Sequence, residues 1–295
     1  MKHLDAMKRH DFMILFDVTD GNPNGDPDAG NLPRVDPETG QGFVTDVALK
    51  RKIRNYVDAL RGTEERFKIY IQQGAVLNER NQRAYTALQK DSKKANTKDV
   101  SETRAWMCDN FFDVRTFGAV MSTEINCGQV RGPVQLTFAR SVDRILPMDA
   151  AITRVALTKA DEKASRNEDT GESTASSGTI GRKAFIPYGL YVGYGFFVPS
   201  YANDTKFDNA DLELVWQALM NMWDLDRSAS RGRTACRGLY VFSHDSALGN
   251  APSHQLFKRI QIPSVGVTRA FEEYDVQVSE TDLPSGVTLT RLLEG

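Results

Sequence analysis

Residues 12–16 read FMILF, residues 20–27 read DGNPNGDP, and residues 47–54 read VALKRKIR. The nearly continuous apolar run predicts a strand over residues 11–18 that is buried on both faces. Glycine, proline, asparagine and aspartate predict a turn-rich loop over residues 19–44. The basic segment predicts a helix over residues 46–61, capped by Thr45 or Asp46. A strand that leads through an ordered loop into a basic helix is suited to holding a polyanion.

The predicted helix carries its cations beside its core face. Apolar residues recur at helical spacing and predict the face that packs on the core, which consists of Leu49, Ile53, Tyr56, Val57 and Leu60. At about 100° per residue, Lys50, Arg54 and Arg61 fall in one stripe beside that face, while Arg51 and Lys52 lie outside the stripe. Intrahelical ion pairs are sparse here, and the helix N-terminus follows a loop with free backbone N–H groups. Phosphate binding and an ordinary solvated basic face both fit this pattern.

The composition predicts a soluble globular protein. The chain has 295 residues, of which 40% are hydrophobic and 26% charged, and its net charge is −2. Any nucleic-acid contact must therefore come from local basic clusters. The three cysteines, Cys108, Cys127 and Cys236, lack the spacing of a zinc site or a disulfide framework and fit a reducing cytoplasm. We find no apolar run of signal-peptide or membrane-span length, so we expect a cytoplasmic protein.

The rest of the chain mixes helices and strands. Residues 63–110 are polar and predict a partly helical insertion, and residues 158–183 predict a protruding excursion rich in Ser, Thr, Gly and Glu. Strands are predicted at 114–121, 130–140, 185–198 and 239–242, a helix at 209–223, and a terminal hairpin from 276–278 and 287–289. This order is compatible with an α+β fold whose core is ferredoxin-like, as in RNA-recognition domains.

Two further stretches are candidates for RNA contact. The segment from Asp226 to Gly238 carries four arginines among small and hydroxyl residues, which favours phosphate contacts over a plain polar connector. Its candidate ligands are Ser230, Arg231 and Arg233. The stretch Arg115-Thr116-Phe117-Gly118 is similar to the aromatic RNA-binding strand of RNA-recognition domains.

The first loop also allows two readings based on metals. Counted from Asp20, its oxygen-bearing side chains nearly follow the EF-hand calcium pattern, but position twelve is Asn31 where that motif has a bidentate glutamate. The loop aspartates, Asp20, Asp26, Asp28 and Asp36, could alternatively hold Mg²⁺ for ribonuclease chemistry. No motif of a known catalytic class accompanies them.

The chain resembles a known family in its most specific motifs. These are Asn22-Pro23-Asn24-Gly25-Asp26-Pro27, Gly30-Asn31-Leu32-Pro33-Arg34, the segment from Thr45 to Arg54, Arg115 to Gly118, Gly128 to Gln135, and Ser230 to Arg233. Together they resemble the repeating backbone subunit of CRISPR Cascade complexes of subtype I-C, in the RAMP superfamily. The resemblance implies a modified RRM/ferredoxin-like palm (1–62, 113–142 and 187–295), a helical fingers insertion (63–112) and a thumb β-hairpin (143–186).

The resemblance also implies a function. The chain would be a non-catalytic subunit that binds the crRNA backbone independently of sequence, stacks head to tail with other copies and presents guide segments to target DNA. Other implied partners are the repeat-handle-binding, large and small subunits, and neither a cofactor nor a metal is expected. The implied RNA-binding residues are Asn22, Asn24, Thr45, Lys50, Arg51, Arg54, Arg115, Phe117, Arg154, Arg166, Arg182, Ser230, Arg231 and Arg233. The alternatives are a metal-dependent ribonuclease that cleaves guide-paired RNA and a calcium-binding protein.

Overall fold

The centre of the molecule is an antiparallel sheet with the strand order β14-β11-β1-β10-β8-β4. The computed structural model describes residues 1–153 and 180–295. In their order across the sheet, these strands are β14 (Val287–Glu294), β11 (Arg233–His244), β1 (His10–Gly21), β10 (Ile180–Phe197), β8 (Ala139–Arg144) and β4 (Gln41–Val44). Two more strands, β7 (Val134–Leu136) and β9 (Met148–Thr153), pair with β10 off this path. The predicted α+β class is confirmed.

Strand β1 lies inside the sheet and is buried on both faces, as its apolar run predicts. Ile14 lies opposite Gly193 of β10 on one side and Leu239 of β11 on the other. Alternate side chains enter two different cores, with Phe12 and Ile14 on one face of the sheet and Met13 on the other. The sheet therefore has a packed layer on each side.

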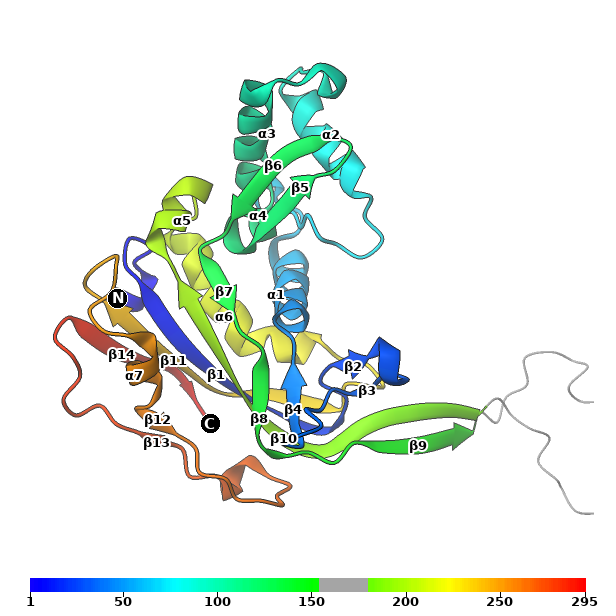
Figure 1. Ribbon diagram of the computed structural model, residues 1–295, viewed down its shortest axis with the longest axis vertical. Helices are drawn as coiled ribbons and strands as arrows, with labels where there is room; N and C mark the ends of the chain where they lie inside the picture. Colours follow the sequence, from blue (N-terminus) through cyan, green and yellow to red (C-terminus); the bar gives the residue numbers. More distant parts are fainter. Residues whose placement is uncertain (154–179) are drawn as a thin grey trace, which may run out of the picture.

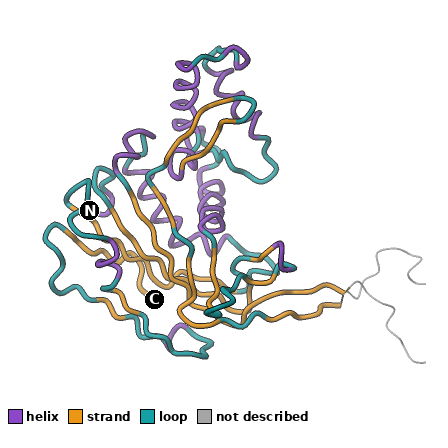
Figure 2. Tube along the Cα trace, viewed as in Figure 1, coloured by secondary structure: helices purple, strands orange, loops and turns teal. Residues whose placement is uncertain are grey.

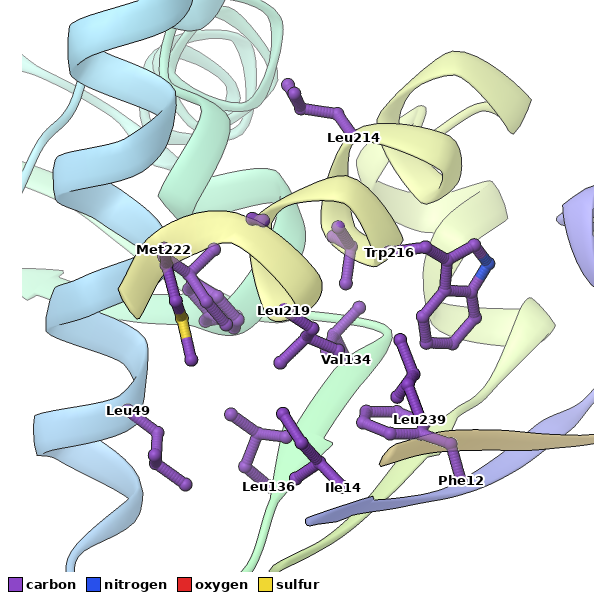
Figure 3. Close-up of a cluster of buried hydrophobic side chains, with 14 of the residues drawn as sticks. Phe12, Ile14, Leu49, Val134, Leu136, Leu214, Trp216, Leu219, Met222 and Leu239 are labelled. Atoms are coloured by element: carbon purple, nitrogen blue, oxygen red, sulfur yellow. The ribbon is translucent and has the colours of Figure 1, made fainter. Parts of the chain in front are cut away.

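The first of these layers is formed by two helices, α1 (Asp46–Arg61) and α6 (Asn209–Leu225) (Figure 1). Figure 3 shows Leu219 and Met222 of α6 above Ile14 of β1, with Leu49 of α1 beside them. Helix α1 has the predicted bounds because Thr45 caps it, its side chain accepting a hydrogen bond from the Ala48 N–H. The predicted core face of α1 is wrong at Leu60, whose side chain lies exposed.

The second layer comes from the C-terminal part of the chain, through α7 (Ser253–Phe257), β12 (Ile260–Gln261) and β13 (Gln277–Val278). The predicted terminal hairpin is wrong. Strand β13 pairs with β12, and β14 pairs with β11 at the edge of the main sheet. A short alternating pattern identifies a strand but does not specify its partner.

A separate lobe rises from this sheet, formed by α2 (Leu77–Ala87), α3 (Thr97–Asn110), α4 (Phe112–Phe117), β5 (Gly118–Ser122) and β6 (Asn126–Arg131). Its own core includes Tyr85, Met107 and Cys127. The cluster runs from Tyr70 to Val130, so the expected boundary between 112 and 113 falls inside it. The predicted strand over 114–121 is also wrong in its first half, because residues 112–117 form a buried helix. Helix α5 (Pro199–Thr205) follows β10.

A two-stranded arm, formed by β9 and the first part of β10, extends away from the sheet (Figure 2). The expected thumb boundaries at 143 and 186 cut through β8 and β10, since both strands continue into the sheet. A small hairpin of β2 (Gly25–Asp26) and β3 (Leu32–Pro33) lies in the loop after β1. Within residues 1–153 and 180–295, no helix has the length and apolar character needed to cross a bilayer.

Candidate nucleic-acid interface

Two loops far apart in sequence meet at one end of the central sheet. The loop after β1 starts at Asn22, whose backbone N–H donates to the Ser230 carbonyl at 2.7 Å. Arg231, in the second loop, also contacts the first, because its Nη1 donates to the carbonyl oxygens of Asn22 at 3.1 Å and Pro23 at 3.4 Å. The loop before β11 is brought here because β11 pairs with β1, with Thr19 opposite Arg233.

Glycine allows the two loops to approach at backbone distance. A Cβ added to Gly21 would lie 2.0 Å from the Arg231 carbonyl oxygen. A Cβ on Gly232, whose φ is +61°, would lie 2.3 Å from the Thr19 carbonyl oxygen. No larger residue fits at either position without moving the backbone.

Asn24 ties the first loop to helix α1. Its Oδ1 accepts hydrogen bonds from the Thr45 backbone N–H and from the Thr45 hydroxyl, both at 3.0 Å. The same Thr45 hydroxyl oxygen accepts the Ala48 N–H at 3.3 Å. Asn24 and Thr45, two of the predicted RNA-binding residues, are thus joined to each other and set where the helix begins.

Two aspartates of the first loop, Asp26 and Asp36, accept hydrogen bonds from nearby backbone N–H groups. The Asp26 carboxylate accepts the Asp28 N–H at 3.2 Å, and Asp36 accepts the N–H groups of Glu38 at 3.1 Å and Thr39 at 3.4 Å. Such contacts are typical of aspartate in turns. Among the described residues, no group of three or more His, Cys, Asp and Glu side chains is placed to hold a metal ion.

The cations of α1 face the protein more than the sequence suggests. Arg54 is 8% exposed, and its Nε donates to Asp113 Oδ2 at 2.7 Å. Arg54 therefore faces Asp113 in this structure, and its contact with RNA stays a prediction. Lys50 pairs with Asp46 at 2.9 Å, with 15% of its side chain exposed, and Arg51 Nη1 donates to the Ile71 carbonyl at 2.6 Å.

Lys52 occupies the other flank of α1, where it is buried against Asp226. Its ammonium group lies over the Trp223 ring, 5.8 Å from the ring centroid. Burial, together with the nearby Arg231 guanidinium, lowers the pKa of Lys52 to about 7. The Asp226 carboxylate also pairs with Arg231 Nε at 3.2 Å. One carboxylate thus links α1 to the loop before β11, a contact that the basic pattern did not predict.

Arg115 and Phe117 are not part of an RNA-binding strand. Arg115 lies in α4 with no solvent exposure, and it forms a double hydrogen bond with the Asp211 carboxylate of α6. Phe117 packs in the main core. The predicted strand is wrong here because local composition did not reveal the helix that turns these side chains inward, and the RNA contacts of Arg115 and Phe117 stay predictions.

A sequence model of one protein family matches most of the chain. The model is described as CRISPR-associated protein Cas7, and it matches residues 8–279. The chain belongs to the Cas7 family.

Relatives of this Cas7 chain agree with the assignment. A protein from Haloferax volcanii strain DS2, called CRISPR-associated protein Cas7, is 26% identical over 243 residues. That match covers 74% of this chain and 66% of the relative, so the chain spans just under two thirds of the curated relative's length. A chain in the solved structure of a "CRISPR RNA-guided surveillance complex, pre-nicking" shares the fold. Its TM-score is 0.50 at 12% identity, over 79% of this chain and 78% of the other.

In this Cas7 chain, the predicted residues divide by accessibility. Ser230 and Arg233 are exposed at the junction of the two loops, and Arg231 is partly exposed there. Arg182 on the arm has 80% of its side chain exposed and pairs with Asp149. Asn22 is buried. Arg154 and Arg166 lie outside the described residues.

Proposed function

We propose that this Cas7 chain is a non-catalytic, repeating backbone subunit of a type I-C CRISPR surveillance complex, and that it binds the crRNA phosphate backbone independently of base sequence. One observation carries the proposal. The Asn22–Asn24 loop, the Ser230–Arg233 loop and the start of α1, which are separate in sequence, are joined by hydrogen bonds at one end of the sheet.

The chemistry of this junction suits a phosphate chain better than a base edge. Arg233 and Ser230 supply a guanidinium and a hydroxyl that are exposed to solvent. Groups of these types donate to phosphate oxygens in any sequence, and this leaves the bases free for pairing. The Arg233 guanidinium therefore extends from the rigid strand β11, next to the Asn22–Asn24 loop that backbone contacts hold in place.

The arm formed by β9 and β10 is the proposed thumb, and the lobe around α2 and α3 is the proposed fingers insertion on an RRM-like palm. The arm carries exposed apolar side chains at Met148 and Ile152, and Leu146, just before β9, is exposed as well. Exposed apolar residues on a projecting ribbon favour contact with another molecule. We propose that copies stack head to tail through such contacts, which form an open filament because the two contacting surfaces differ.

The remaining partners follow from the same proposal. Besides crRNA and other copies, they are the repeat-handle-binding, large and small subunits, with target DNA recognised through the guide in the cytoplasm. The subtype I-C assignment is supported by the loop motifs between Asn22 and Arg34. The structural relative is a chain of an RNA-guided complex, which supports the role of a guide RNA.

The test is the salt dependence of binding to single-stranded RNA of mixed sequence. Arg233→Ala and Arg182→Ala each remove an exposed cation from the proposed RNA path, and Lys98→Ala removes one from the surface of α3 as the control. Each lost phosphate contact is expected to reduce the slope of log K against log salt by about 0.7, while the control keeps the wild-type slope.

Two results would count against the proposal. Wild-type slopes in both arginine variants would show that this surface does not bind phosphate. Magnesium-dependent cleavage of RNA paired to the guide would show that the subunit is catalytic. Binding that increases with RNA length would support stacking along the guide.

A further inference from the structure

We infer that Arg231 is a positioning residue, which fixes the Asn22–Pro23 loop through a carboxylate shared with Lys52 and does not itself grip the guide phosphate. This inference rests on the proposed function for what the loop does, but the contacts that support it are independent of RNA. It separates Arg231 from its neighbour Arg233, although both belong to the same arginine-rich segment.

The first step is the direction of the Arg231 donors. Nη1 points at two consecutive backbone carbonyls, those of Asn22 and Pro23. Nε lies 3.2 Å from Asp226 Oδ2, which is an ion-pair distance. A guanidinium is planar and rigid, so hydrogen bonds from Nη1 on one side and the ion pair with Asp226 on the other determine where the whole group lies. The group is thus engaged with protein atoms on two of its edges.

The second step is the anchoring of Asp226. Its carboxylate also pairs with Lys52, whose side chain is only 5% exposed and lies over Trp223. A buried ammonium requires a partner, and Asp226 is the carboxylate that the structure places beside it. Asp226 is therefore held by α1 and can hold Arg231 in turn. The result is a continuous chain of contacts from Lys52 through Asp226 and Arg231 to Asn22.

The third step is the state of the loop that Arg231 contacts. The Asn22 N–H donates to the Ser230 carbonyl, and the adjacent Gly21 and Gly232 backbones touch. Loss of the Arg231 donors leaves two carbonyls without these hydrogen bonds and releases one side of this junction. Arg233 is held differently, because it belongs to β11 and pairs with Thr19 in the sheet. Removal of the Arg233 side chain therefore leaves the loop in place.

The experiment combines amide hydrogen exchange with RNA binding. Exchange at the Asn22 amide is measured by mass spectrometry or NMR on the full chain without RNA, in wild type, Arg231→Ala, Arg231→Lys and Asp226→Asn. Arg233→Ala is the matched control, an arginine two positions away. Arg231→Ala and Asp226→Asn are expected to speed exchange at Asn22 about tenfold or more, because charge-assisted hydrogen bonds of this kind shift an opening equilibrium by that factor.

The variants are expected to differ in both readouts. Arg231→Lys keeps the positive charge but replaces the planar guanidinium with a single ammonium group. Its Asn22 amide should therefore exchange more slowly than in Arg231→Ala but faster than in wild type. Arg231→Ala should weaken RNA binding with a salt slope equal to that of wild type. Arg233→Ala should reduce the slope with exchange equal to that of wild type. Thermal unfolding monitors the fold, and Arg231→Lys supplies the comparison if the alanine variant does not fold.

The inference is overturned if Arg231→Ala shows wild-type exchange at Asn22, or if it reduces the salt slope as Arg233→Ala does. Failure of the proposed function would look different. The exchange result would still follow the prediction, but none of the purified variants, nor the wild type, would bind RNA.

Discussion

Arg115 of α4 and Asp211 of α6 form a bidentate ion pair, with Nη2 2.8 Å from Oδ1 and Nε 2.9 Å from Oδ2. Neither side chain is accessible to solvent. The pair joins the helical lobe to the helix that covers the sheet. Asp211 also accepts the Asp208 N–H at the start of α6. A residue that the sequence suggested for RNA contact is thus a structural connection between two parts of the molecule.

Arg115→Ala is expected to lower the free energy of unfolding by about 3–5 kcal/mol, since it leaves the Asp211 charge buried without its main partner. Urea unfolding followed by circular dichroism measures the change. Arg83→Ala is the matched control, because Arg83 pairs with Glu65 at the surface. An exposed pair of this kind contributes about 0–1 kcal/mol. Equal effects of the two substitutions would contradict the assignment.

Arg54→Ala and Lys50→Ala are expected to affect different properties although both residues lie on α1. Arg54 pairs with Asp113, which is buried and also accepts the backbone N–H groups of Tyr70 at 2.7 Å and Ile71 at 3.0 Å. Arg54→Ala should therefore destabilise the fold by about 3 kcal/mol. Lys50→Ala removes a partly exposed i,i+4 pair with Asp46, and such a pair contributes about 0.3–0.5 kcal/mol.

RNA titrations distinguish the two sites further. Arg54→Ala should retain the wild-type salt slope at temperatures where it is folded, because its guanidinium faces Asp113. A shallower slope in folded Arg54→Ala would show that this side chain reaches RNA after all.

The buried histidine His10 predicts loss of stability in acid. Its Nδ1 lies 3.0 Å from the Ser243 hydroxyl and its Nε2 2.9 Å from the Asp5 carbonyl. Burial lowers the pKa of His10 from the usual 6.5 to about 4. At a pH between 4 and 6.5, the imidazole is protonated in the unfolded chain but largely neutral in the folded chain. A fall in pH through this range therefore favours unfolding.

The contribution of His10 is fully present above pH 6.5 and is lost as the pH falls to 4, with a total loss of about 3 kcal/mol. Urea unfolding across this range, in wild type and His10→Gln, measures it as the difference in pH dependence. His254→Gln serves as the control because His254 lies exposed. Parallel pH curves for wild type and His10→Gln would refute the prediction.

Gly232→Ala and Gly30→Ala compare two glycines with the same φ of +61°. Gly30 has open space around a new Cβ, whereas Gly232 faces the Thr19 carbonyl oxygen. The left-handed backbone alone costs about 1–2 kcal/mol with alanine. Gly232→Ala should cost about 1–3 kcal/mol more because the contact forces the backbone to move. Equal loss of thermal stability in the two variants would show that the loops can separate freely.

The elements with a strong period could be predicted from the sequence. Strand β1 appears where its continuous apolar run places it, and helices α1 and α6 appear where their periodic apolar faces place them, because these side chains are the ones that the core buries. The segment around Arg115 could not be predicted in the same way. Its charged side chain is satisfied by Asp211, 96 positions later in the chain, and local composition contains no information on that partner.

The candidate site was predicted in part. The sequence identified the two loops, and the pairing of β1 with β11 brings them together. It could not assign the direction of each cation. Helical spacing places Arg54 beside the core face, but Asp113 then draws it inward, and Asp226 does the same for Lys52. Acidic partners from distant segments therefore decide which basic residues remain available.

The arm and the sheet share one strand, and this has a mechanical consequence. Strand β10 runs without interruption through 18 residues, pairing first with β9 and then with β1 as far as Phe197. Tension applied to the arm is therefore carried along a single covalent backbone into the middle of the sheet. There the backbone hydrogen bonds between β10 and β1 are loaded together in shear. The arm joins the sheet beside the loop junction, because Ile186, which follows the last pair with β9, lies opposite Gly21.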